Sequence, residues 1–243
     1  MVGIRRAIAL LILGFYITQF AMTALLGPDE LFACYLAMSL CYGLAFVGLA
    51  AQWFWARWFA MGVGNFGALL LLVLFKIGPE PLIAIVGGSH LIIALCLLGE
   101  GMAASYEHSE HTAERWNFQE ESMALMRRAV KSAGSTLPML ILYTLAPKAD
   151  TFSYLVLTAG LLGLFGLLRG RTWGVFLLGA TGATALLGGL GVFGPPPVGY
   201  VIFCAQGLPV IYGPFVGILA GGLMLIPLIF AGPMIRFIRA QPA

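Results

Sequence analysis

The chain consists of apolar runs that are each about as long as the hydrocarbon core of a bilayer is thick. A helix that crosses this core needs about 20 consecutive apolar residues. Only 9% of the residues are charged, whereas a soluble domain carries roughly 25%, so the chain has too few charges to cover a water-facing surface. The runs are continuous and do not alternate with a period of two, which disfavours a β-barrel. The sequence therefore predicts an all-α integral membrane protein.

Eight of these runs fit transmembrane helices, and eight spans with short turns nearly fill the chain. The predicted spans cover residues 7–26, 32–52, 58–76, 81–99, 133–147, 151–168, 172–193 and 207–232. The last run contains Pro209, Pro214 and Pro227 together with glycines, so a straight helix is not expected there. We predict a short outer or re-entrant helix over 197–208, followed by a kinked span.

The basic residues indicate how the spans are oriented. Arg5 and Arg6 precede the first span. If they are cytoplasmic, all of the 13 Lys and Arg residues except Lys76 and Lys148 fall on that side, as the positive-inside rule requires. An odd number of spans would place Arg236 outside. We therefore predict a multi-pass protein whose N- and C-termini are both cytoplasmic.

Landmarks of the first half recur in the second half at a nearly constant offset. Pro28 matches Pro147 at an offset of 119 residues, and Trp58 matches Trp173 at an offset of 115. Both halves begin and end on the same side, so two four-helix repeats would be parallel and related by an axis along the membrane normal. We divide the chain into a first four-helix half over 1–99, a cytoplasmic loop over 100–132 and a second four-helix half over 133–243 with an irregular last span.

The loop over 100–132 is the only substantial polar segment. Within it, Met123, Met126 and Val130 are interspersed with charged residues. This pattern predicts an amphipathic helix over 110–131 that lies on the cytoplasmic leaflet.

The same loop holds the only pattern that resembles a metal site. His108, His111 and Glu114 are spaced so that they could share one face of a helix. Clusters of histidine and carboxylate suit zinc or non-haem iron. A solvated polar face is the simpler interpretation, so we predict no metal or cofactor and keep these three residues as weak candidates.

Two of the predicted cytoplasmic turns pair arginine with tryptophan. Arg57 precedes Trp58, and Arg171 stands two residues before Trp173. Aromatic rings settle at the headgroup level, and arginine extends its charge toward phosphate. We predict that these four residues anchor the turns at the membrane interface, where bound lipid is expected.

Few polar residues lie inside the predicted spans. His90 is in the middle of the fourth span, about 14 Å from either end at 1.5 Å per residue. An ionisable residue at that depth is a candidate for function. Pro79 matches Pro195 at an offset of 116 residues, and the same offset makes Gln206 the equivalent of His90 in the second half. With Asn65 and Gln19, these are the candidate substrate or ligand residues. Two alternatives remain for His90, namely a neutral ring hydrogen-bonded to a neighbouring helix and a metal or haem ligand.

No Asp or Glu lies inside any predicted span. Proton- and sodium-coupled carriers rely on such carboxylates, so ion-driven transport is disfavoured. The sequence favours a non-catalytic polytopic membrane subunit that packs in a larger membrane protein assembly. Its expected partners are the lipid bilayer and other membrane subunits or further copies of the chain, with no nucleic acid. One alternative is a small transporter or channel for a neutral or lipid-like solute with a site between the two halves. Another is a membrane enzyme that uses the region of His108 and His111.

Overall fold

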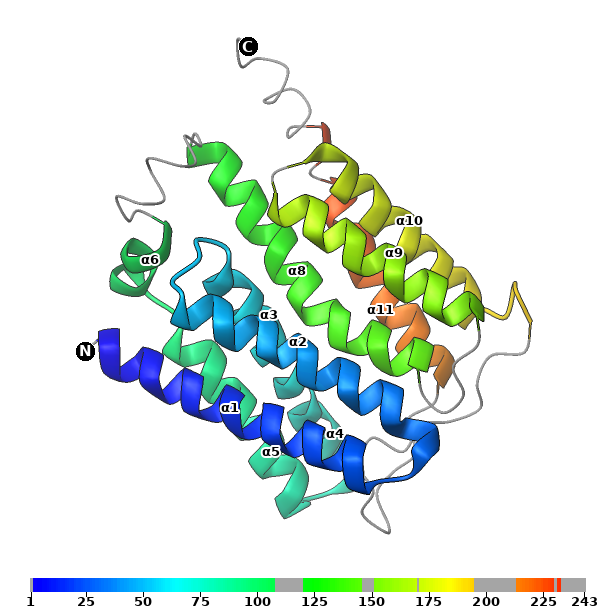
Figure 1. Ribbon diagram of the computed structural model, residues 1–243, viewed down its shortest axis with the longest axis horizontal. Coiled ribbons are helices and arrows are strands. Elements are labelled where there is room, and N and C mark those ends of the chain that lie inside the picture. Colours follow the sequence, from blue (N-terminus) through cyan, green and yellow to red (C-terminus); the bar gives the residue numbers. More distant parts are fainter. Residues whose placement is uncertain are drawn as a thin grey trace. The chain divides into compact units, whose positions relative to one another are not determined.

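The computed structural model describes residues 2–107, 120–145, 151–169, 171–194, 213–229 and 231–232 (Figure 1). These residues form helices and turns, and no strand occurs among them, which confirms the all-α prediction for this part of the chain. The elements are α1 (Val2–Leu26), the short 3-10 helix η1 (Asp29–Leu31), α2 (Phe32–Ala50), α3 (Ala56–Ala68), α4 (Leu70–Ile77), α5 (Pro81–Cys96), α6 (Glu100–Glu107), α8 (Glu120–Leu145), α9 (Thr151–Leu168), α10 (Thr172–Gly189) and α11 (Gly213–Ile229).

Several of the described helices are long and apolar enough to cross a membrane, which fits an integral membrane protein. Four segments of the described chain meet both criteria: Val2–Leu26, Asp29–Ala50, Ala56–Phe75 and Thr151–Leu168. The number rises to five if α5 and α6, which are bent by 72° relative to each other, count as one broken span. α10 and α11 are apolar but shorter.

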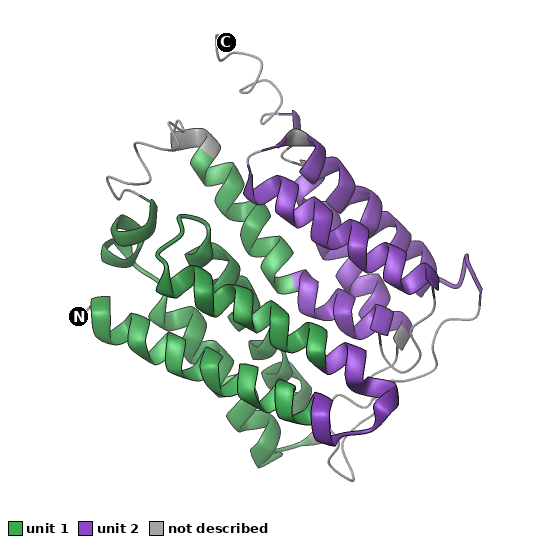
Figure 2. Ribbon diagram, viewed as in Figure 1, with its two compact units in different colours: residues 1–23, 36–135 green, residues 24–35, 136–243 purple. Residues whose placement is uncertain are grey.

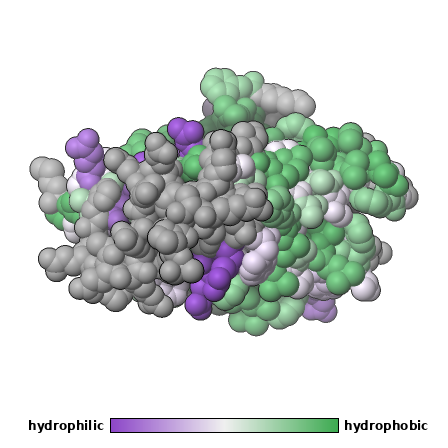
Figure 3. All heavy atoms as spheres, turned by 90° about the horizontal axis from the view of Figure 1, so that it is seen from above, coloured by the Kyte–Doolittle hydropathy of each residue, from purple (hydrophilic) through white to green (hydrophobic). Residues whose placement is uncertain are grey.

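The exterior of these helices carries many large apolar side chains. Phe75 is 89% exposed, and Leu11 and Phe165 are also exposed. Apolar residues cover much of the described surface that is visible in Figure 3. Such a surface is stable among lipid acyl chains, because its exposure to water would be unfavourable.

The chain forms two compact units (Figure 2). Unit 1 contains residues 1–23 and 36–135, and unit 2 contains residues 24–35 and 136–243. The division inside α8 lies a few residues beyond the boundary that we predict between the loop and the second half. The described parts of the predicted loop belong to unit 1.

The first part of α8 differs from the predicted interfacial helix. α8 runs without interruption from Glu120 to Leu145, so the described part of the predicted amphipathic helix continues directly into the next predicted span. Met126 and Val130 are buried. A Cβ on Gly134 would lie 2.5 Å from the Phe59 carbonyl oxygen of α3, so the two backbones approach closely. The apolar face of this segment therefore packs on protein, because small residues let α8 approach α3.

Two arginines cap the end of α5 inside unit 1. The bend between α5 and α6 leaves backbone carbonyls without helical partners. Arg5 Nη2 donates to the Leu98 carbonyl, and Arg57 Nη1 donates to the Leu97 carbonyl at 2.9 Å. Gly99 has a φ of 97°, a left-handed conformation that favours glycine where a helix ends. The start of α1, the start of α3 and the end of α5 therefore meet at one end of unit 1.

In unit 2, α10 packs against both α9 and α11 through glycines. A Cβ on Gly163 of α9 would lie 2.9 Å from the Leu178 backbone nitrogen. A Cβ on Gly182 would lie 2.9 Å from the Gly221 carbonyl oxygen of α11. Close backbone contact of this kind is typical of helix packing in membranes.

Candidate functional site

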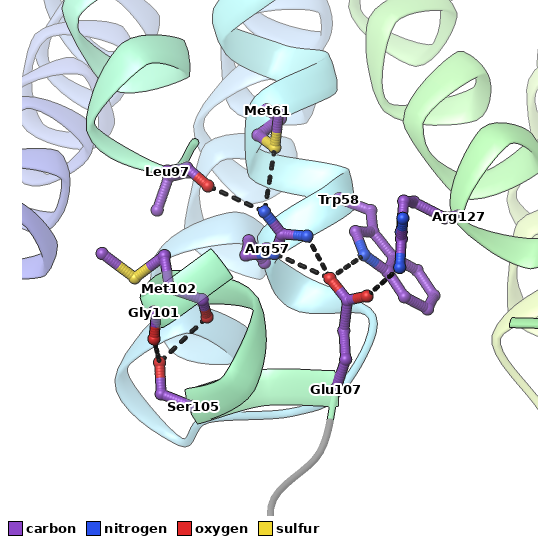
Figure 4. Close-up of polar contacts among 9 residues, drawn as sticks. All are labelled: Arg57, Trp58, Met61, Leu97, Gly101, Met102, Ser105, Glu107 and Arg127. Atoms are coloured by element: carbon purple, nitrogen blue, oxygen red, sulfur yellow. Dashed lines mark hydrogen bonds and ion pairs between the residues drawn. The ribbon is translucent and has the colours of Figure 1, made fainter. Parts of the chain in front are cut away.

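Unit 1 contains two clusters of hydrogen-bonded polar side chains, each centred on a buried residue. The His90 cluster consists of Tyr16, Tyr42, Ser89 and His90 and lies in the interior of the helix bundle. The Glu107 cluster consists of Arg57, Trp58, Glu107 and Arg127 and lies beside the capped end of α5 (Figure 4).

The imidazole of His90 is only 2% exposed, and both of its nitrogens are hydrogen-bonded. Nδ1 is 2.8 Å from the Val86 carbonyl oxygen, and Nε2 is 2.6 Å from the Tyr42 hydroxyl. A carbonyl only accepts, so Nδ1 carries the donated proton. In the neutral ring, Nε2 then accepts from the Tyr42 hydroxyl. His90 is therefore hydrogen-bonded to a neighbouring helix, which is one of the alternatives left open by the sequence.

Tyr16 and Ser89 extend this network from α1 to α5. Ser89 Oγ donates to the Val86 carbonyl at 2.9 Å, which leaves its oxygen free to accept. The Tyr16 hydroxyl, 2.7 Å away, then donates to Ser89 Oγ. The ring of Tyr16 also packs on His90 with centroids 4.3 Å apart. Two tyrosines from two helices thus fix the polar side chains of α5.

Glycines of α3 close the remaining side of His90. A Cβ on Gly67 would overlap the imidazole ring, and a Cβ on Gly64 would lie 2.9 Å from the His90 carbonyl oxygen. The ring is therefore enclosed by α1, α2 and α3. A ligand would have to displace one of these helices to reach either nitrogen.

The other candidate ligand residues do not join this cluster within the described chain. Gln19 is exposed on α1, and its carbonyl accepts from the Thr23 hydroxyl at 2.8 Å. Asn65 is half-buried near the end of α3, where its carbonyl accepts from the Leu69 backbone at 3.1 Å. No hydrogen bond among the described residues links either amide side chain to His90. Gln206 lies outside the described residues.

The carboxylate of Glu107 is the centre of the second cluster. Its Oε1 accepts from Arg57 Nε at 2.8 Å, from Arg57 Nη2 and from Trp58 Nε1 at 2.7 Å. Its Oε2 accepts from Arg127 Nη2. Figure 4 shows these donors converging on one carboxylate from α3 and α8. Glu107 therefore ties α6 to two other helices of unit 1.

The two guanidinium groups of this cluster are unequally buried. The side chain of Arg57 is 7% exposed, that of Glu107 is 0% exposed, and that of Arg127 is 44% exposed. Two guanidinium groups on one carboxylate leave one positive charge in the cluster. Because Arg57 is the enclosed partner, the excess charge lies toward Arg127.

The sequence of α6 explains how Glu107 reaches this position. Met102 and Tyr106 are one turn apart, so they share a face, and both are buried. The Tyr106 hydroxyl donates to the Leu49 carbonyl at 3.0 Å. Burial raises the pKa of the Tyr106 phenol, which keeps it a neutral donor. This face fixes α6, and the next residue along the chain is Glu107.

The predicted interface anchors divide into two pairs. Arg171 is exposed and Trp173 is 47% exposed, so both are accessible to headgroups. Arg57 and Trp58 are instead enclosed by protein, because Glu107 offers a carboxylate that compensates the buried charge. Sequence reasoning did not predict that Glu107 contacts Arg57, Trp58 and Arg127. The only local signal was the apolar face that precedes Glu107.

The weak metal candidates His108, His111 and Glu114 lie outside the described residues. Within the residues that are described, no group of three or more His, Cys, Asp or Glu side chains could hold a metal ion.

No protein-family model matches this sequence, and comparisons with curated proteins and with solved structures found no significant similarity.

Proposed function

We propose that the chain is a non-catalytic polytopic membrane subunit that packs in a larger membrane protein assembly. The observation that supports this most is the closure of the His90 cluster. The two nitrogens of His90 and the hydroxyls of Tyr16, Tyr42 and Ser89 are bonded to one another or to the Val86 carbonyl. Among the described residues, no buried side-chain nitrogen or oxygen lacks a hydrogen-bond partner.

Catalytic and transport sites need polar groups that converge on a cavity and remain available for a substrate. His90 is the sequence-based candidate for such a site, since it is ionisable and lies in the interior of unit 1. Its ring is instead covered by Gly67 and by Tyr16. The interior of unit 1 therefore serves packing, and the exterior is where a function would be carried out.

The exterior suits contact with other transmembrane helices. Helices associate in lipid through close packing at small residues, since lipid tails are as apolar as leucine. A Cβ on Gly43, Gly88 or Gly222 would meet nothing within 4 Å. These glycines, on α2, α5 and α11, leave room for the backbone of another helix.

We also propose eight spans with both termini in the cytoplasm, built as two parallel four-helix repeats. In this arrangement α8, α10 and α11 cross the membrane along with the longer apolar helices. The meeting of Arg5, Arg57 and Arg127 at one end of unit 1 supports it, because the positive-inside rule places all three on the cytoplasmic side.

The proposal is tested by purifying the tagged full-length protein from its native membrane in a mild detergent. We expect stoichiometric membrane partners or a defined homo-oligomer. At least one of Gly43→Leu, Gly88→Leu and Gly222→Leu should release the partner without unfolding the protein. A stable monomer that retains a small solute, and loses it in His90→Gln, would instead support the transporter.

A further inference from the structure

Arg127 is the member of the Glu107 cluster whose cation faces outward. In the described part of the chain its one hydrogen bond runs from Nη2 to Glu107 Oε2. Glu107 is already paired with Arg57 through two nitrogens, so its charge is neutralised without Arg127. The positive charge of Arg127 is therefore uncompensated within the cluster, on a side chain that is 44% exposed.

This guanidinium is also held in place. Glu107 binds one of its nitrogens, and its central carbon lies 6.0 Å from the centroid of the Trp58 ring, a cation–π contact. A free arginine side chain loses much rotamer entropy when it binds a ligand. Arg127 has lost part of that freedom already, so an anion that binds its open edge meets a preorganised partner.

A second cation adjoins Arg127 on α8. Lys131 is one turn later on the same face and is half-buried. Near the other helices at this end of unit 1, the side chains of Trp53 and Leu98 are exposed. Basic side chains beside exposed aromatic and apolar groups are the combination found at the headgroup level of a membrane.

We propose that Arg127, with Lys131, binds the phosphate of an anionic phospholipid of the cytoplasmic leaflet. The planar guanidinium matches two phosphate oxygens, and the adjoining cation favours an anionic over a zwitterionic headgroup. Glu107 positions Arg127 for this contact and does not itself touch the lipid. The leaflet rests on the orientation proposed above, whereas the site itself does not depend on protein partners.

The experiment is a lipid titration of delipidated full-length protein followed by native mass spectrometry. The probes are phosphatidylglycerol and phosphatidylcholine with the same acyl chains. We expect Arg127→Gln to weaken phosphatidylglycerol binding about five- to tenfold, and Arg127→Lys to weaken it by less, with little effect on phosphatidylcholine. Both variants should fold, since Glu107 keeps Arg57 and Trp58 as partners.

Arg169→Gln is the matched control. Arg169 is exposed on the same predicted side and lies over the Phe165 ring at 5.2 Å. Within the described chain no carboxylate holds its guanidinium in place, so its loss should change phosphatidylglycerol binding less than the loss of Arg127 does, by less than about twofold. Wild-type affinity in a folded Arg127→Gln protein would overturn the proposal. So would displacement of the lipid by excess inorganic phosphate, because the ligand would then be free phosphate.

Discussion

The helix pair α3–α5 of unit 1 and the helix pair α10–α11 of unit 2 both start with an arginine and a tryptophan. The two pairs differ in how deeply these side chains are buried. Arg57 and Trp58 lie in the first turn of α3, whereas Arg171 directly precedes α10 and Trp173 is the second residue of that helix. Trp58 is 0% exposed, whereas Trp173 is 47% exposed. The difference follows from Glu107, which gives the first pair an internal carboxylate. The acidic residues in the described part of unit 2 are Asp29 and Glu30 of η1, and neither is hydrogen-bonded to Arg171 or Trp173.

The two pairs also differ in what their glycines face. Gly67 of α3 leaves room for the His90 ring, which is hydrogen-bonded to Tyr42. Gly179 of α10 leaves room for the flexible end of Leu228 on α11. A similar arrangement of small residues thus accommodates a polar network in unit 1 and an aliphatic side chain in unit 2. Small residues alone therefore do not identify a polar site.

The largest expected effect is that of removing the carboxylate. Glu107→Ala leaves the guanidinium of Arg57 buried without its partner, which should reduce the free energy of unfolding by about 3–5 kcal/mol. Arg171→Ala should cause no measurable change, because Arg171 is exposed. Equilibrium unfolding in mixed micelles measures both. Equal effects of the two substitutions would contradict the claim that Arg57 depends on a buried carboxylate and Arg171 does not.

Filling the space at the glycines should have a smaller effect. Gly67→Ala places a methyl group on the His90 ring, which two hydrogen bonds hold in place, so we expect a loss of about 2–3 kcal/mol. Gly179→Ala meets the end of a leucine side chain that can change rotamer, so its cost should be about 1 kcal/mol. The same unfolding assay compares them. A larger loss for Gly179→Ala would show that His90 is not fixed by its network.

The smallest expected effect concerns single hydroxyl groups. Tyr42→Phe leaves His90 Nε2 without its partner and should cost about 1–2 kcal/mol. Thr181→Val removes a hydroxyl that bonds only the Leu177 carbonyl of its own helix, so we expect a smaller change. Thermal unfolding of the two variants in one detergent would rank them. If Thr181→Val were the more destabilising variant, the result would contradict the claim that the His90 cluster stabilises unit 1 more than a hydroxyl bonded within one helix does.

In the described part of the chain the apolar runs form helices, because an apolar run of membrane length permits little besides a helix. The predicted span over 151–168 has the same bounds as α9. The depth of His90 also made it a candidate from sequence alone. Its burial is now visible, while its role in function stays a prediction.

Two features were not predictable, for a physical reason in each case. Arg57 and Glu107 are 50 residues apart, and nothing local marks them as partners. An arginine beside a tryptophan is compatible with a headgroup anchor as well as with a buried ion pair. The continuity of α8 was hidden because its charged first half resembles a surface helix, although Met126 and Val130 are buried.

The claim that Glu107 brings Arg57 into the interior of unit 1 is tested most directly by a double-mutant cycle. The variants are Arg57→Ala, Glu107→Ala and the double substitution, compared by equilibrium unfolding in mixed micelles. We predict a coupling free energy of about 2–3 kcal/mol, because Glu107→Ala alone leaves the charge of Arg57 buried without a carboxylate, and the double substitution removes that charge. Single effects that add to within about 0.5 kcal/mol would contradict the account.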